Sequence, residues 1–435
     1  MTSQKIGFWA VFALVAGSQI GSGVFLLPAA LAPFGAISLL GWIISGLGAI
    51  ALALVFGQLC ARIPKTGGPH AYVQESFGPT AAFFTGWTYW IISWISTSAV
   101  IVTAIGYLLP LIGDQPKFIV VGLEIVLLTL ITLLNLRGVK ASGNAEFVLT
   151  LMKIIPLLLL PIAALFFFDY GNFVKDSSIM EFTDSEIISK VTLMTLWGFI
   201  GVESATTPAG SVENPSKTIP RAIVIGTVCV ALLYLMNSIS IMGVIPGQDL
   251  MNSKAPYGDA ARIVFGGNWH LGISLIASII CIGTLNAWVL TSGQISLGLA
   301  QDRFLPKFFA KRNKHTAPYM GLLISSFGIL PLLILTASDN LAQQINLIID
   351  FSVMAFLFVY AICVLSFLKI LYQNRHEGSI FQWIYGLGAI GFCGWIFYNT
   401  EFTTLLISGS FVVSGLPMYF FMNRPSKSKD ASVAD

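Results

Sequence analysis

Apolar residues gather into twelve long stretches that are separated by mostly short polar connections. Each stretch approaches or exceeds the roughly 20 residues that a helix needs to cross a bilayer. Helices are required because lipid offers no partner for the backbone of an open strand. The pattern therefore predicts an all-α multi-pass membrane protein with 12 transmembrane helices, over residues 7–32, 36–60, 81–111, 118–136, 145–168, 189–211, 220–244, 270–300, 318–336, 343–371, 380–398 and 402–422.

Composition narrows the class of protein further. Of the 435 residues, 56% are apolar and 10% are charged, whereas a soluble domain carries about 25% charged residues. This difference argues against a soluble enzyme, a nucleic-acid-binding protein and a disordered chain. The five cysteines lie singly in or beside apolar stretches and the four histidines are scattered, so we expect no disulfide framework, no metal site and no cofactor.

The distribution of Lys and Arg predicts the orientation. Of the 23 Lys and Arg residues, 17 lie at the N-terminus or on connections on the same side of the membrane as the N-terminus. Five lie on connections on the opposite side. Positive residues accumulate on the cytoplasmic side. We therefore expect both termini in the cytoplasm and a location in the cell membrane, which is a bacterial inner membrane or a plasma membrane. A polar C-terminal tail, 423–435, follows the last span.

The first and sixth spans carry glycines and hydroxyl residues in their interiors. These segments are Gly17-Ser18-Gln19-Ile20-Gly21-Ser22-Gly23 and Trp197-Gly198-Phe199-Ile200-Gly201-Val202-Glu203-Ser204. Each glycine lowers helix stability by about 1 kcal/mol, so both segments favour an unwound backbone. Such a break is tolerated in a membrane only where it lines a cavity or is buried in protein. Close helix packing at Gly-x-Gly is the alternative explanation.

The spacing of the two segments predicts the internal organisation. Spans 1 and 6 are five apart, which is the separation expected of two inverted five-helix repeats whose broken first helices form the binding site. We expect a single transmembrane transporter domain, with repeats over about 7–168 and 189–371 and two extra helices over about 380–422.

The breaks would expose peptide groups at mid-membrane depth. Freed amides at Ser22, Gly23 and Val24 can bind a carboxylate, helped by the positive end of the half-helix that follows. Freed carbonyls from Trp197 to Ile200 can accept hydrogen bonds from an α-ammonium. Together these groups predict a receptor for the zwitterion of an amino acid.

Several motifs resemble those of one transporter superfamily. Gly21-Ser22-Gly23-Val24-Phe25-Leu26-Leu27-Pro28 resembles the first-helix signature of the amino acid–polyamine–organocation (APC) superfamily. Residues 196–204 resemble helix 6 of its basic amino acid/polyamine antiporters, and Val212-Glu213-Asn214-Pro215 resembles the connection that follows. The resemblance covers about residues 6–420. It implies the LeuT-type fold of two inverted five-helix repeats with broken helices 1 and 6.

The resemblance also implies a function. It points to a secondary active amino acid antiporter, which exchanges a cationic amino acid for a related amino acid or amine as arginine/agmatine and ornithine/putrescine antiporters do. Transport of this kind involves no covalent chemistry, so we expect no enzyme activity. The chain has no GxxxxGK[ST] phosphate loop, so we expect no ATP-driven step. The resembling arginine antiporters are dimers, which implies a homodimer here.

Two other functions stay open. A proton-coupled or facilitative transporter of neutral amino acids is favoured by Lys153, Ser18 and Val100, where the closest-looking antiporters differ. A membrane-embedded enzyme or receptor is the least favoured, because Glu203 and Asp350 are accompanied by no nucleophile–base spacing.

Aromatic and polar residues on the spans are the candidates for the walls of the site. A tryptophan face binds a cation, although a membrane tryptophan also serves as packing or as an interface anchor. Trp197 lies on the second break, and the resemblance places Trp288 near the substrate and Tyr89 at a gating position. Ser18 and Thr97 stand where the arginine antiporters use asparagines. The predicted substrate-binding residues are Ser18, Ser22, Gly23, Tyr89, Thr97, Trp197, Ile200 and Trp288.

Three of the charged residues that lie within spans, where a lone charge is costly, are candidates for a functional role. Glu203 follows the second break and is the candidate for proton coupling, with a structural acid as the alternative. Lys153 in span 5 resembles lysines that occupy the place of a sodium ion in related transporters, or it extends to the cytoplasmic interface. Asp350 is expected to hold a substrate's distal cation, to pair with Lys153, or to be a plain helix-end acid.

Overall fold

The computed structural model describes residues 5–21, 23–113, 115–173, 183–253, 256–335, 341–374 and 379–422, without the side chains of Leu26 and of 341–347. Every regular element in these ranges is a helix. Ten helices there are long and apolar enough to cross a membrane. The long helical elements are α3 (Ser38–Arg62), α4 (Pro69–Gly106), α6 (Lys117–Asn135), α7 (Val139–Ala164), α8 (Asp184–Leu196), α9 (Pro215–Val244), α12 (Trp269–Gln301), α14 (Leu341–Gln373), α15 (Ile380–Tyr398) and α16 (Phe402–Val413) with α17 (Leu416–Met422).

Shorter helices complete the structure. Two predicted spans correspond to elements below the length of a full crossing, namely the pair α1 (Phe8–Gln19) and α2 (Gly23–Leu31), and α13 (Tyr319–Leu335). The predicted total of twelve therefore requires these elements to cross as well. The connections hold α5 (Leu109–Ile112), α10 (Gly247–Met251), α11 (Pro256–Phe265) and short 3-10 turns.

Both predicted interruptions are present. Helix α1 ends at Gln19, Ile20 is extended, and α2 begins at Gly23. Helix α8 ends at Leu196 and continues as a 3-10 turn, η5 (Trp197–Phe199), before an extended Ile200. Gly201 then has a φ of 106°. Residues with a side chain rarely adopt this backbone conformation, whereas glycine adopts it freely. The 3-10 turn η6 (Ser204–Thr206) follows.

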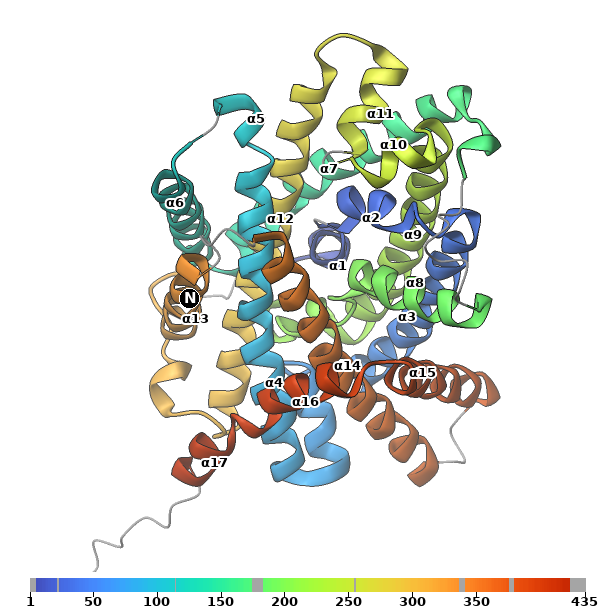
Figure 1. Cartoon of the computed structure of the whole chain (residues 1–435). Coiled ribbons are helices and arrows are strands. Elements are labelled where there is room, and N and C mark those ends of the chain that lie inside the picture. Colours follow the sequence, from blue (N-terminus) through green and yellow to red (C-terminus); the bar gives the residue numbers. More distant parts are fainter. Residues whose placement is uncertain are drawn as a thin grey trace, which may run out of the picture.

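The helices pack in two groups around the breaks. In one group, α9 contacts α1 and α3, and α3 also contacts α8. In the other group, α4, α6, α12 and α13 all contact one another, and α7 packs against α1, α9 and α12. Helix α14 packs against both α3 and α4. Figure 1 shows α1 and α2 near the centre of this arrangement. The first break is therefore enclosed by protein, as a mid-membrane interruption must be.

The third predicted span is preceded by a helical segment that was not predicted. The third span was expected to begin at residue 81, but α4 begins at Pro69 and bends at Gly78, where φ is 82°. A positive φ at glycine lets two helical segments join at an angle without a loop. The polar residues that indicated a connection belong to the first, shorter segment.

Large apolar side chains are exposed along the outer helices. Examples are Phe118 on α6, Phe166 after α7, Phe327 on α13 and Phe381 on α15. An apolar surface of this extent fits contact with lipid. Of the five free cysteines, Cys229 is exposed on this surface and the other four are buried.

Candidate substrate site

A pocket lies between the two breaks. Its cavity volume is about 20 Å³, which is room for little more than one water molecule, so a substrate requires the surrounding walls to move apart. The lining comes from α1, α2, α4, η5 and α12 and from the breaks themselves, and comprises Ser18, Gln19, Gly21, Gly23, Ser96, Val100, Trp197, Gly198, Ile200, Thr284 and Trp288. None of these lining residues is ionisable, so a charged ligand would be met by peptide groups, hydroxyls and aromatic rings.

Side chains tie the first break to its neighbours. The Ser18 hydroxyl lies 3.0 Å from the Gly201 carbonyl oxygen and 2.8 Å from the Ser204 hydroxyl, so it joins the two breaks directly. The Trp288 indole N–H donates to the Ser18 carbonyl at 3.2 Å, and the Thr284 hydroxyl donates to the Ile20 carbonyl at 2.6 Å. These bonds satisfy carbonyls that the end of α1 leaves without helical partners.

Five of the predicted substrate-binding residues line the pocket. They are Ser18, Gly23, Trp197, Ile200 and Trp288. Ser22 lies outside the described residues. The prediction started from the breaks and therefore included these residues. It did not include Gln19 and Thr284, which also line the pocket.

The residues that α4 contributes to the pocket differ from those predicted from the sequence. Thr97 is buried, and its hydroxyl donates to the Trp94 carbonyl at 2.6 Å instead of facing the pocket. Ser96 and Val100 line the pocket in its place. These two residues are four apart and share a helix face, whereas Thr97 lies on the neighbouring face. Tyr89 is also absent from the lining.

Tyr89 lies instead beside Glu203. Glu203 is fully buried, and one of its carboxylate oxygens accepts a hydrogen bond from the Tyr360 hydroxyl. The same hydroxyl accepts the Gly201 N–H at 3.1 Å. Tyr360 therefore links the carboxylate to the backbone of the second break, and the sequence reasoning did not find this tyrosine.

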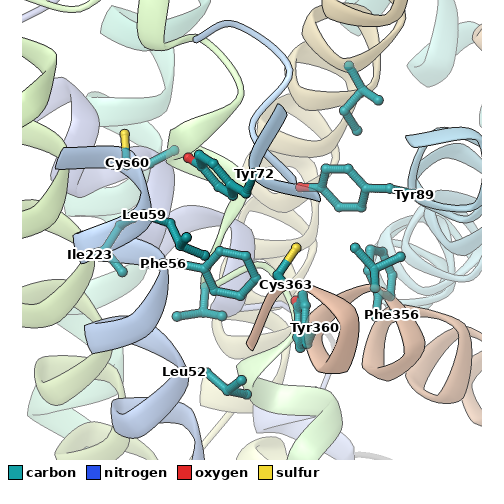
Figure 2. Packing of buried hydrophobic residues seen from close by; sticks show 14 of the residues in the cluster. Leu52, Phe56, Leu59, Cys60, Tyr72, Tyr89, Ile223, Phe356, Tyr360 and Cys363 are labelled. Atoms are coloured by element: carbon teal, nitrogen blue, oxygen red, sulfur yellow. The ribbon is translucent and has the colours of Figure 1, made fainter. Parts of the chain in front are cut away.

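Aromatic packing connects this carboxylate region to the pocket. Figure 2 shows Tyr89, Tyr360 and Phe356 packed in one buried cluster with Tyr72. The Phe356 ring lies 6.0 Å from the Tyr89 ring and 5.1 Å from the Trp288 ring, between ring centroids. The cluster therefore packs behind Trp288, which lines the pocket.

Lys153 is fully buried against the first break. Its ammonium donates to the Gly17 carbonyl at 2.8 Å and to the Thr284 hydroxyl at 3.1 Å, and it forms an ion pair with Glu146 at 3.5 Å. The expected pairing with Asp350 is wrong, because Asp350 is exposed on α14. Asp350 is also absent from the pocket lining. A cation at the C-terminal end of α1 is favourably placed for the helix dipole.

Comparison with known proteins decides the family. The family described as "Amino acid permease" matches residues 6–423. The chain belongs to the amino acid permease family. This confirms the resemblance to the APC superfamily.

Several named relatives align with most of this permease. It is 32% identical to the "Cadaverine/lysine antiporter" of Escherichia coli (strain K12), over 78% of this chain and 77% of the relative. It is 30% identical to the "Putrescine transporter PotE" of Haemophilus influenzae, over 91% and 97% respectively. It is 28% identical to a "Putative arginine/ornithine antiporter" of Bacillus subtilis, over 99% of both chains.

Proposed function

We propose that this permease is a secondary active antiporter that exchanges a cationic amino acid for a related amino acid or amine. The observation that carries the proposal is the pocket between two interrupted spans, where peptide groups and two tryptophans meet. The names of the three relatives support the substrate class, because lysine, arginine and ornithine are cationic amino acids and cadaverine and putrescine are the corresponding diamines.

Each part of such a substrate has a partner in the pocket. The α-carboxylate would bind the amides at the N-terminal end of α2, near Gly23 and Val24, where helical N–H groups lack partners. The α-ammonium would bind carbonyls of the second break between Trp197 and Ile200. The distal cation would lie against the ring faces of Trp197 and Trp288. An aromatic face attracts a cation even where no carboxylate is present to pair with it.

We further propose the detailed architecture that the resemblance implies. Two inverted five-helix repeats, about 7–168 and 189–371, would rock around the central pocket in alternating access. Two extra helices, 380–422, would complete twelve crossings with both termini in the cytoplasm. A homodimer is the proposed assembly.

Sodium should be unnecessary for transport. The Lys153 ammonium already donates to the Gly17 carbonyl and the Thr284 hydroxyl, and carbonyl and hydroxyl oxygens are the ligands that a hard cation would need. Replacing external and internal sodium with choline is therefore expected to leave the initial rate in proteoliposomes within about twofold, since the ligand oxygens are already satisfied. A strict sodium requirement would contradict this role of Lys153.

Exchange can be tested by counterflow in proteoliposomes. Vesicles would be loaded with unlabelled lysine, ornithine, arginine, cadaverine or putrescine and diluted into radiolabelled lysine, ornithine or arginine. An obligate exchanger is expected to take up label at least about tenfold faster into a loaded vesicle than into an empty one, because the empty carrier does not return. Equal uptake into empty vesicles would indicate a uniporter, and conversion of the label to another compound would indicate an enzyme.

One observation favours a second candidate, a carrier of neutral amino acids. No residue of the pocket lining carries a carboxylate that could pair with a distal cation. The same assay separates the two candidates when unlabelled leucine, alanine and serine are added as competitors. Stronger inhibition by these neutral amino acids than by lysine would support the second candidate.

A further inference from the structure

Glu146 is a fully buried carboxylate that lies two helical turns before Lys153 on α7. The Asn286 amide donates to one of its oxygens at 2.8 Å. The Thr150 hydroxyl, at 3.3 Å, and the Lys153 ammonium, at 3.5 Å, donate to the other. Both carboxylate oxygens are therefore satisfied by named donors, as a buried charge requires.

The helices around this ion pair approach it at glycines. A methyl group added to Gly17 on α1 would collide with the Glu146 carboxylate. A methyl group added to Gly283 on α12 would lie 2.5 Å from Cε of Lys153. Three helices, α1, α7 and α12, thus enclose the Lys153–Glu146 pair without room for a larger side chain at either position.

The pair lies directly behind the pocket wall. Lys153 donates to the carbonyl of Gly17, the residue before the pocket-lining Ser18. It also donates to the hydroxyl of Thr284, which lines the pocket and itself donates to the Ile20 carbonyl. A shift of the ammonium would therefore move the end of α1 and one wall of the pocket.

Two asparagines extend the hydrogen-bond network on the other side of the carboxylate. Asn286, which donates to Glu146, lies within 3.2 Å of the Ser142 carbonyl and accepts a hydrogen bond from Asn135 at 3.0 Å. The result is a continuous polar path from α6 through α12 and α7 to the break in the first span. In a low-dielectric interior, such a network fixes the geometry of its members.

We propose that Glu146 is a positioning residue for substrate binding. It holds the Lys153 ammonium against Gly17 and Thr284, and so sets the position of the first break relative to α12. The inference rests on the proposed transport function. Without the carboxylate, the buried ammonium keeps the Gly17 carbonyl and the Thr284 hydroxyl but has no counter-charge, so its burial at the end of α1 becomes costly.

Three variants test the proposal: Glu146→Gln, Lys153→Met and the double variant. KM and Vmax would be measured by exchange of labelled lysine, ornithine and arginine, and the melting temperature would be measured without substrate. Each single variant is expected to raise KM about tenfold with Vmax within about threefold, and the double variant is expected to be no worse, since the two residues act as a unit.

The melting temperature separates positioning from general stability. Lys153→Met leaves a lone buried carboxylate, so its melting temperature is expected to fall by several degrees, and adding Glu146→Gln is expected to restore part of that loss. KM is expected to stay high in the double variant. Exposed Glu75, changed to Gln, is the matched control and should alter neither quantity.

Any one of three results would overturn the proposal. The first is a KM of Glu146→Gln equal to that of the parent, and the second is additive effects on KM in the double variant. The third is a KM in the double variant that recovers together with its melting temperature. If Glu146→Gln does not fold, the double variant and Asn286→Ala supply the same comparison. A parent protein that transports none of the three amino acids contradicts the proposed function instead, and the melting temperatures then decide alone whether the two charges act as a pair.

Discussion

Replacing Trp197 with leucine is expected to weaken substrate binding at least about 30-fold, because a desolvated cation–π contact contributes about 2 kcal/mol or more. Trp197 lines the pocket, and its ring lies close to Gly23 at the start of α2. Leucine keeps an apolar side chain but has no aromatic face. The loss should therefore appear in affinity and leave the fold intact.

Ligand-induced thermal stabilisation gives the affinity of the purified protein. Trp9, which is 65% exposed on α1, provides the control: Trp9→Leu removes the same group far from the pocket and should bind normally. Trp197→Phe should recover part of the affinity. If folded Trp197→Leu bound lysine, ornithine or arginine as the parent does, the aromatic wall would have no role.

Changing Glu203 to glutamine is expected to make the transport rate insensitive to pH. Glu203 is connected through the Tyr360 hydroxyl to the backbone of Gly201, so a proton on the carboxylate alters the hydrogen bonds that hold the second break. Glutamine imitates the neutral carboxyl at every pH. Where the parent rate changes about tenfold with pH, the variant rate should stay within about twofold, because the titrating group has been removed.

The comparison requires exchange rates at several pH values with the same pH on both sides of the vesicle. Glu213→Gln is a suitable control, because Glu213 is exposed on the connection before α9. Its pH profile should match that of the parent. An acid-activated profile that persists in Glu203→Gln would exclude Glu203 as the switch and would place the coupling proton elsewhere.

The outline of the fold was predictable because it is determined by short segments of sequence rather than by contacts between distant residues. Long apolar stretches must be helical in lipid, and glycines within two of them weaken the helix where the structure shows breaks. Gly201 shows this directly, since its positive φ is one that few other residues adopt. The start of α4 was not predictable, because a glycine that joins two helical segments and a glycine in a loop look alike in sequence.

The site was predictable only as far as it depends on the backbone. Residues on the breaks, such as Ser18 and Ile200, were found, while Tyr360 and Thr284 were missed because their role depends on how distant helices pack. The face of α4 that meets the pocket is set by such packing, and this is why Ser96 lines it and Thr97 does not. Glu146 was also not predicted, although its spacing of seven residues from Lys153 places both on one face of a helix.

A structure of the protein in a lipid nanodisc with bound lysine, ornithine or arginine tests the central claim most directly. The account expects the carboxylate within hydrogen-bond distance of the amides of Gly23 or Val24, and the α-ammonium within such distance of carbonyls between residues 197 and 200. Ligand density outside the pocket, or continuous helical hydrogen bonding through residues 17–25 and 197–204, would contradict it.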